Sequence, residues 1–264
     1  MSEEKKIRIE KGDCLEFAKK HIATRAIDMV VTSPPYDNLR KYNGFEFDED
    51  ATIKALYDVV KIGGVVAWVV QDATVKGSKT GSSFRQALKF KEAGFNIHDV
   101  MIWNKGCFSA VGALHSRYAP VFEYIFIFSK GAPRVFNPLK DRPNKHAGTF
   151  VHGNIRQKDG TVKDMSGKGV KKIGAFGQRF NVWEMPPVMS RKDTSHPAPF
   201  PVRLASDLII SWTRPGDLVF DPFTGSGSTA VAALQTGRQF IGCDISAEYV
   251  EMAKNRILSE RKNK

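Results

Sequence analysis

The chain has 264 residues, 42% of them hydrophobic, which is enough for one large α/β domain with a small inserted lobe. Its 40 Lys and Arg residues exceed its 28 Asp and Glu residues, so the formal net charge is +12. We therefore expect a polyanionic partner, with nucleic acid ahead of an anionic membrane surface. No apolar run approaches the roughly 18 residues that span a bilayer. No apolar signal segment follows the charged N-terminus, so a cytoplasmic protein is expected.

Cysteine usage agrees with a cytoplasmic protein. Cys14, Cys107 and Cys243 are widely spaced and form no C-x-x-C pair, so neither a metal site nor a redox site is expected. Each lies beside apolar sequence and is interpreted as a small core residue, not as an activated nucleophile.

Strands and helices alternate along the first half of the chain. Apolar runs predict strands at residues 7–10, 27–31, 65–70, 96–103 and 121–128. Helical spacing predicts helices at 15–22, 51–60 and 83–93. This alternation predicts a mostly parallel sheet with both faces covered.

The first strand runs into Gly12-Asp13. Asp13 therefore lies at the carboxyl end of a strand, where α/β sheets bind their ligands. It could equally cap the helix that follows.

A proline motif, Val31-Thr32-Ser33-Pro34-Pro35-Tyr36, ends the second strand. Each proline fixes φ and removes an N–H group, so the nearby carbonyl groups point in fixed directions and have few internal partners. With a hydroxyl before them and an aromatic ring after them, they could hold a flat, amine-bearing ligand. A rigid turn without function is the alternative interpretation.

A basic segment follows the first five strands. Residues 134–192 contain 13 Lys plus Arg against 4 Asp plus Glu, a difference of nine charges, and seven glycines fall between Gly148 and Gly177. A structureless loop of this length is unusual inside a domain, so we interpret it as a ligand-facing insertion that binds phosphates. A solvated loop without function is the alternative. The expected organisation is residues 1–133, an insertion at 134–180, and residues 181–264.

Regular structure then resumes at 181–183, with strands expected at 218–220 and 239–243 and helices at 201–212 and 230–235. A glycine motif, Phe220-Asp221-Pro222-Phe223-Thr224-Gly225-Ser226-Gly227-Ser228-Thr229, joins one of these strands to a helix. Glycines there allow a tight turn and close approach of a ligand. No Gly-Lys-Ser/Thr ending follows, which argues against a phosphate-binding nucleotidase loop.

Asp244 follows Gly227 by 17 positions, near the spacing at which dinucleotide folds place an acid on ribose. A cofactor containing adenosine is therefore expected, although a simple tight turn is the alternative. Because Asp221 would repel a pyrophosphate, a cationic cofactor such as S-adenosylmethionine is favoured.

The proline motif and the glycine motif together resemble the amino-methyltransferases of DNA. The order of proline motif, basic insertion and glycine motif resembles their circularly permuted β group. Gly12-Asp13, His196 to Pro201 and Gly242 to Asp244 extend this resemblance over nearly the whole chain. It implies a Rossmann-like, seven-stranded, mostly parallel sheet with one antiparallel strand and an inserted target-recognition region.

The resemblance also implies roles for individual residues. The pocket for S-adenosylmethionine would be lined by Asp221, Phe223, Thr224, Gly225, Ser226 and Gly227. Asp244 would hold the ribose, Asp13 the adenine amine, and Ser195 and His196 would approach the methionine end. The expected DNA contacts are Arg40, Lys145, Arg156, Lys163, Lys168, Lys171, Lys172 and Arg179. No metal is expected.

In the implied reaction, a base is flipped out of double-stranded DNA. Tyr36 stacks on it, while Ser33 and the Pro34 carbonyl orient its exocyclic amine, and Pro35 keeps the motif rigid. Relatives with Ser-Pro-Pro-Tyr mostly modify N4 of cytosine, and those with Asp- or Asn-Pro-Pro-Tyr mostly modify N6 of adenine, so Ser33 favours cytosine. An RNA or small-molecule methyltransferase and a non-catalytic DNA-binding protein are the rival hypotheses. A cognate restriction endonuclease is a candidate partner, and both a monomer and a homodimer are compatible with the sequence.

Overall fold

The computed structural model describes residues 7–35, 47–107, 116–150, 154–164, 172–188 and 200–262. The chain divides into two compact units. The first unit comprises Met1–Asn137 and Asn181–Lys264, and the second is Pro138–Phe180.

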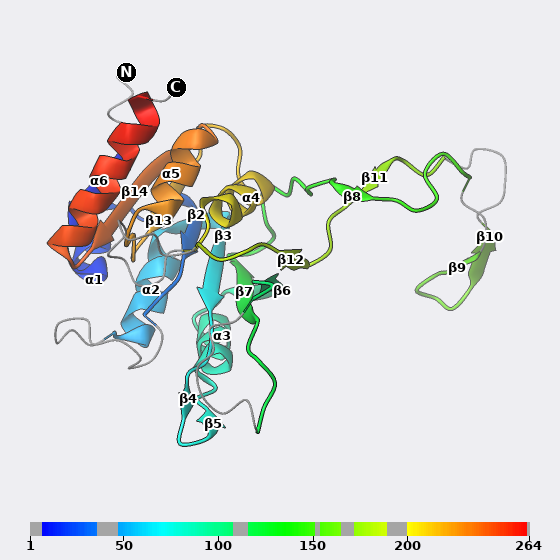
Figure 1. Ribbon diagram of the computed structural model, residues 1–264, viewed down its shortest axis with the longest axis horizontal. Coiled ribbons are helices and arrows are strands. Elements are labelled where there is room, and N and C mark those ends of the chain that lie inside the picture. The colour runs from blue at the N-terminus through cyan, green and yellow to red at the C-terminus, as the bar shows by residue number, and fades with distance from the viewer. Residues whose placement is uncertain are drawn as a thin grey trace. The chain divides into compact units, whose positions relative to one another are not determined.

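A single large sheet forms the centre of the first unit (Figure 1). Across the sheet, its strands are β1 (Ile7–Lys11), β14 (Gln239–Asp244), β13 (Leu218–Asp221), β2 (Ile27–Thr32), β3 (Val60–Val70), β7 (Phe122–Ser129), β6 (Asn96–Asn104) and β12 (Val182–Glu184). Only β7 runs antiparallel to its neighbours. The prediction of one antiparallel strand is therefore confirmed. The sheet has eight strands where seven were expected, because the three-residue β12 extends it beyond β6.

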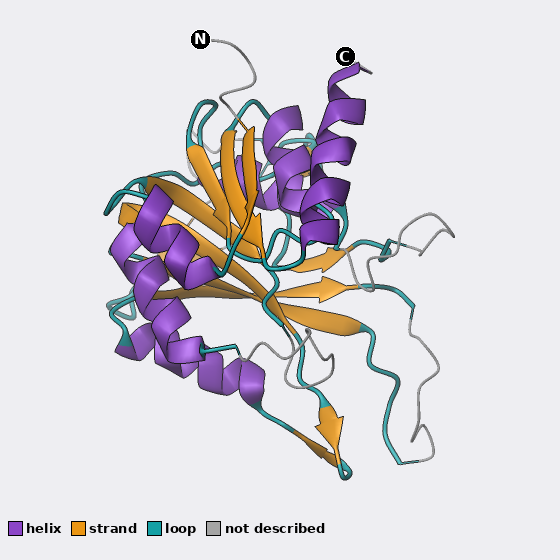
Figure 2. Cartoon of the chain, turned by 90° about the vertical axis from the view of Figure 1, so that its left-hand side faces the viewer, coloured by secondary structure: helices purple, strands orange, loops and turns teal. Residues whose placement is uncertain are grey.

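Helices cover both faces of this sheet (Figure 2). They are α1 (Cys14–His21), α2 (Glu49–Val59), α3 (Ser82–Glu92), α4 (Val202–Trp212), α5 (Ser228–Gln235) and α6 (Ala247–Lys262). α1 contacts α2 and α2 contacts α3, while α4 contacts α5 and α5 contacts α6. With both faces covered, β2 is buried at all six positions, as its continuous apolar sequence predicts.

Two features of this unit are absent from the predictions. α6 is not among the predicted helices. The predicted loop at residues 73–81 contains a hairpin of two short strands, β4 (Thr74–Val75) and β5 (Ser78–Lys79).

Aromatic side chains dominate the core between α3 and the sheet. The rings of Phe90 and Phe128 stack with their centroids 4.0 Å apart, and Trp68 meets Phe90 edge-on at 5.0 Å. The buried indole N–H of Trp68 donates to Gln86 Oε1 at 2.9 Å, so its one polar atom is satisfied. This packing holds β3, and hence the edge of the sheet where β2 and β3 end.

The second unit consists of short strand pairs. β8 (Arg142–Pro143) pairs with β11 (Phe176–Gly177), and β9 (Asn154–Arg156) pairs with β10 (Val162–Asp164). No side chain with a described environment in this unit is buried. Its cohesion comes from surface contacts such as the Arg142 guanidinium over the Phe180 ring, 4.4 Å from its centroid.

Among the described residues, no helix is both long and apolar enough to cross a membrane. The same residues contain no group of three or more His, Cys, Asp or Glu that could hold a metal ion.

Candidate active site

The carboxyl ends of four neighbouring parallel strands bring the sequence motifs to one edge of the sheet. Phe220 in β13 is in register with Val30 in β2, so Asp221 and the glycine motif lie beside the proline motif. On the other side of β13, Asp221 is in register with Gly242, two residues before Asp244. β1 then places Lys11 beside Asp244, so Asp13 joins the same edge. Motifs up to about 230 residues apart in sequence therefore meet in space.

Asp221 is the most deeply buried acid of this edge, with 1% of its surface exposed. Its Oδ1 accepts hydrogen bonds from the Thr32 hydroxyl at 2.6 Å and the Phe223 N–H at 3.0 Å, and its Oδ2 accepts one from the Thr229 hydroxyl at 2.6 Å. Burial raises the pKa of Asp221 to about 6, against the lowering effect of these three donors.

The hydrogen bonds of Asp221 join the two motifs directly. Thr32 immediately precedes Ser33, and Thr229 lies in the first turn of α5, where its hydroxyl is also 3.3 Å from the Val31 carbonyl oxygen. Sequence reasoning missed both threonines as functional residues. A polar residue at the end of an otherwise apolar strand was the available signal for Thr32.

The glycine motif turns in a conformation that side chains rarely adopt. Gly225 has φ of +50° and Gly227 has φ of +84°. A Cβ on Gly227 would lie 2.9 Å from the Cβ of Ala253 in α6, so only glycine fits there. Arg256, also in α6, places Nη1 3.3 Å from both the Ser226 carbonyl oxygen and the Ser228 hydroxyl. The unpredicted helix α6 therefore supports this loop from behind.

Asp244 holds the start of the same loop from the neighbouring strand. Its Oδ2 accepts from the Gly225 N–H at 2.8 Å and its Oδ1 from the Ser246 N–H at 2.9 Å. Burial raises the pKa of Asp244, opposed by these backbone donors. Thr224 is tied to β14 as well, because its N–H donates to the Cys243 carbonyl at 2.9 Å.

Asp13 lies nearby, since the Gly12 N–H donates to the Asp244 carbonyl at 3.0 Å. The exposed Asp13 caps α1, with Oδ1 accepting from the Leu15 N–H at 2.9 Å and the Glu16 N–H at 3.2 Å. The capping alternative is therefore realised, while its contact with an adenine amine stays a prediction.

The proline motif ends β2 as expected. Pro34 is buried, and Ser33 and Pro35 are half-buried. Tyr36, Arg40, Ser195 and His196 lie outside the described residues. Phe47, where the described chain resumes, meets Phe223 of the glycine motif edge-on, with ring centroids 5.4 Å apart.

The prediction that every cysteine is a small core residue is wrong for Cys107, which is exposed, whereas Cys14 is half-buried and Cys243 is buried. Burial raises the pKa of Cys14 to about 11, and burial also raises that of Cys243, whose thiol donates to the Pro222 carbonyl at 3.5 Å. Both thiols therefore stay protonated near neutral pH.

The predicted DNA contacts of the second unit differ in their surroundings. Lys145, Arg156 and Lys163 are exposed. Lys172 places Nζ 5.5 Å from the centroid of the Phe150 ring. Arg179 forms a two-pronged ion pair with Asp141, so its charge is largely neutralised within the unit. Lys168 and Lys171 lie outside the described residues.

Comparison with known proteins gives consistent similarities. A family model for DNA methylases, N6_N4_Mtase, matches residues 27–255. The orphan methyltransferase M.BamHII of Bacillus amyloliquefaciens is 48% identical over 246 residues, covering 90% of this chain and 91% of that protein. The DNA adenine methyltransferase YhdJ of Escherichia coli (strain K12) is 26% identical over 254 residues, covering 93% of this chain and 81% of that protein. The structure of PvuII DNA methyltransferase (cytosine-N4-specific) has a TM-score of 0.70 at 21% identity, covering 97% of this chain and 89% of that one, which shows a shared fold.

Proposed function

We propose that this chain, which belongs to the N6_N4_Mtase family of DNA methylases, transfers a methyl group to N4 of cytosine in double-stranded DNA. The family makes it an S-adenosylmethionine-dependent methyltransferase of the cytosine-N4 or adenine-N6 type. The proposal adds three points to the family assignment: cytosine is the target base, the residues of the two motifs form the site, and the insertion recognises the target sequence.

One observation carries the proposal: the hydrogen bond of 2.6 Å between Thr32 and Asp221. It joins the residue before Ser33 to the residue that begins the turn into the glycine motif. A base amine held at Ser33 and Pro34 would therefore lie beside the loop that holds the methyl donor. Such positioning supplies a large share of the rate in a direct transfer between two bound partners.

The residues present fit S-adenosylmethionine. Each oxygen of Asp244 accepts one backbone N–H, which leaves lone pairs for ribose hydroxyl groups. No side chain among the described residues caps the N-terminus of α5, so its N–H groups face the glycine loop. When bound there, S-adenosylmethionine supplies a methyl group on a cationic sulfur.

The proline motif would present the base. Ser33 and the Pro34 carbonyl accept hydrogen bonds from the exocyclic amine, which directs the nitrogen lone pair at the methyl carbon. Tyr36 would stack on the flipped base. The amine would gain the methyl group as the bond between that methyl and the sulfonium sulfur breaks, and it would then release one proton to water. No covalent bond between the chain and the base is required, in agreement with the protonated Cys14 and Cys243.

The choice of cytosine over adenine as the target base depends on Ser33. A hydroxyl can accept a hydrogen bond from either amine, and the relatives include one named as an adenine enzyme and a fold neighbour named as cytosine-N4-specific. Adenine N6 is therefore the second candidate.

A direct assay tests the proposal. The protein is incubated with labelled S-adenosylmethionine and with duplex DNA, RNA or neither, and the modified nucleoside is identified by mass spectrometry. We expect N4-methylcytosine in DNA. N6-methyladenine would overturn the base assignment, and label in RNA alone would overturn the DNA substrate.

Tyr36 offers a second test of the same mechanism. Tyr36→Ala should lower the methylation rate far more than the affinity for S-adenosylmethionine. The control is Tyr57→Phe, at a half-buried tyrosine in the last turns of α2. Equal loss of both quantities would give Tyr36 a structural role.

A further inference from the structure

A small hairpin lies at the same edge of the sheet as the proline motif and has no part in the mechanism above. Thr32 in β2 is in register with Trp68 in β3, and β3 ends two residues later at Val70. The hairpin of β4 and β5 follows directly (Figure 1). It therefore starts at the same edge of the sheet as Ser33 and Pro34, which hold the flipped base in the proposed mechanism.

Arg117 fixes the hairpin to the chain that enters β7. Its Nη2 donates to the Gly77 carbonyl at 2.8 Å, and its Nη1 is 3.5 Å from the Thr74 hydroxyl. β7 starts at this edge too, because Gln71 Nε2 donates to the Phe122 carbonyl at 3.0 Å. Residues 74–79 and 116–118 thus form one surface, named here the edge hairpin surface.

This surface is basic. Lys76 and Lys79 are exposed, and residues 74–81 contain no acidic residue. The nearby carboxylate of Asp72 accepts from the Ser82 hydroxyl and the Ser83 N–H at the start of α3. Lys79 Nζ donates to the backbone carbonyl of Asp72 at 3.2 Å, a contact that leaves the lysine charge without an anionic partner. Among the described residues, no ion pair involves Lys76, Lys79 or Arg117.

Lys76 stands in an unusual place. It has φ of +48° and precedes Gly77 with φ of +79° in a two-residue turn, where Asn and Gly are the favoured residues. A lysine at this position adopts a backbone conformation that is unfavourable for its residue type, and it places a positive charge at the tip of the hairpin. Strain of this kind is concentrated at functional sites.

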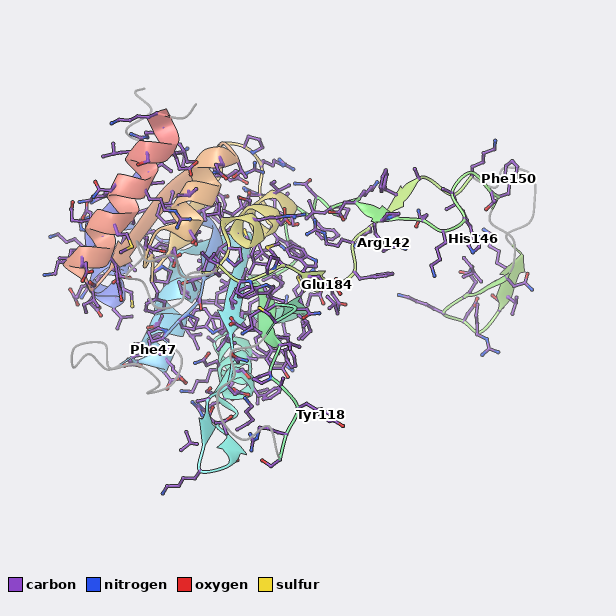
Figure 3. All side chains as sticks on the ribbon, in the orientation of Figure 1. Phe47, Tyr118, Arg142, His146, Phe150 and Glu184 are labelled. Atoms are coloured by element: carbon purple, nitrogen blue, oxygen red, sulfur yellow. The ribbon has the colours of Figure 1, made fainter. Side chains whose placement is uncertain are left out.

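Tyr118 completes the surface. Its side chain is 99% exposed, and it points away from the surrounding chain (Figure 3). Its ring has no aromatic or cationic partner within the described part of the chain, and such an exposed ring can stack on a base or wedge beside one.

We propose that the edge hairpin surface binds the DNA duplex beside the target base. Lys76 and Lys79 contact phosphates, Arg117 holds the hairpin in place, and Tyr118 packs against the bases next to the gap that flipping opens. This contact lies within the first unit and is separate from the basic insertion. The inference rests on the proposed function.

Salt-dependent binding tests the lysines. The full chain is titrated with random-sequence duplex DNA between about 50 and 200 mM salt. The variant is Lys76→Gly/Lys79→Ala, in which Gly suits the turn. Loss of two phosphate contacts should reduce the slope of log K against log [salt] by about 1.8. The control is Lys19→Ala/Lys20→Ala, two exposed lysines in the last turn of α1, and it should keep the wild-type slope.

Tyr118→Ala should weaken duplex binding by about tenfold, a typical loss for a removed base stack, while Tyr118→Phe should retain it. A wild-type slope in the lysine variant, or equal affinity of Tyr118→Ala and wild type, would overturn the inference. If the wild-type chain binds and methylates no duplex DNA, the proposed function itself fails, so the two failures are distinguishable.

Discussion

The two units of this chain use polar residues in opposite ways. In the first unit, Asp221 lies at the edge of the sheet that carries the proline and glycine motifs. It is buried there and accepts three hydrogen bonds from the chain. In the second unit, no side chain with a described environment is buried, and charged groups lie over exposed rings or pair at the surface. The hydrogen bonds of the first unit fix the Asp221 carboxylate in one position, whereas the charged groups of the second unit stay near the surface.

This difference suits two tasks of a DNA methyltransferase. Transfer of a methyl group requires two partners held within a narrow range of geometry. Attraction to DNA requires accessible positive charge, and the second unit has ten Lys and Arg against three Asp and Glu, a net +7. Substitutions in the two units can test this contrast.

Removal of a buried acid should cost far more than removal of an exposed one. Asp221→Ala leaves two hydroxyl groups and one N–H without their buried acceptor, so the free energy of unfolding should fall by about 3–5 kcal/mol. Asp141→Ala, in the second unit, should cost less than about 1 kcal/mol. Urea denaturation followed by circular dichroism measures both. Equal losses would contradict the contrast.

Two glycines provide a matched pair. Gly227 has φ of +84° and faces Ala253, whereas Gly160 has φ of +85° and open space, with nothing within 4 Å of where a Cβ would lie. Both Ala variants incur a similar backbone cost, about 1–2 kcal/mol. Only Gly227→Ala adds overpacking of about 1–3 kcal/mol. Thermal denaturation should therefore show the larger loss for Gly227→Ala, and methylation should fall with it.

The raised pKa of Asp221 predicts a pH effect with a definite sign. Its pKa is about 6 in the folded chain against 3.8 as its ordinary value, so the folded state holds the proton more tightly. Wild-type stability should therefore fall as the pH rises from about 4 to about 6, by on the order of 2 kcal/mol. Asp221→Asn lacks this contribution.

The measurement is the difference in unfolding free energy between wild type and Asp221→Asn at several pH values in this window. The variant should gain on the wild type as the pH rises. The opposite trend would mean that the three donors outweigh burial and hold the pKa below 3.8.

The smallest effects are expected in the second unit. Arg156→Ala/Lys163→Ala removes two exposed charges and should reduce the salt slope of DNA binding by about 1.8. Arg179→Ala should change the slope less, because Asp141 already pairs with Arg179. A larger effect for Arg179→Ala would show that this ion pair opens on DNA.

Local sequence was sufficient for most elements of the fold. Continuous apolar runs such as Ile27–Val31 mark buried strands, because a strand covered on both faces must be apolar at every position. The helix α6 was missed, since it has only three buried residues along Ala247–Lys262 and its apolar stripe is weak. The strand β12 is too short to signal an eighth position in the sheet.

The sequence by itself determined which chemistry is present: a rigid proline motif, a glycine motif, acids at strand ends and a basic insertion. The residue types and spacings of these motifs are local properties, and each can be interpreted from backbone dihedral limits and from side-chain charge alone. Only the tertiary structure decided that Thr32 and Thr229 hold Asp221, that Arg256 supports the glycine loop, and that a basic hairpin follows β3 at the same edge of the sheet as the proline motif. These contacts join residues as many as 189 positions apart, and such pairings depend on strand order, which no local pattern specifies.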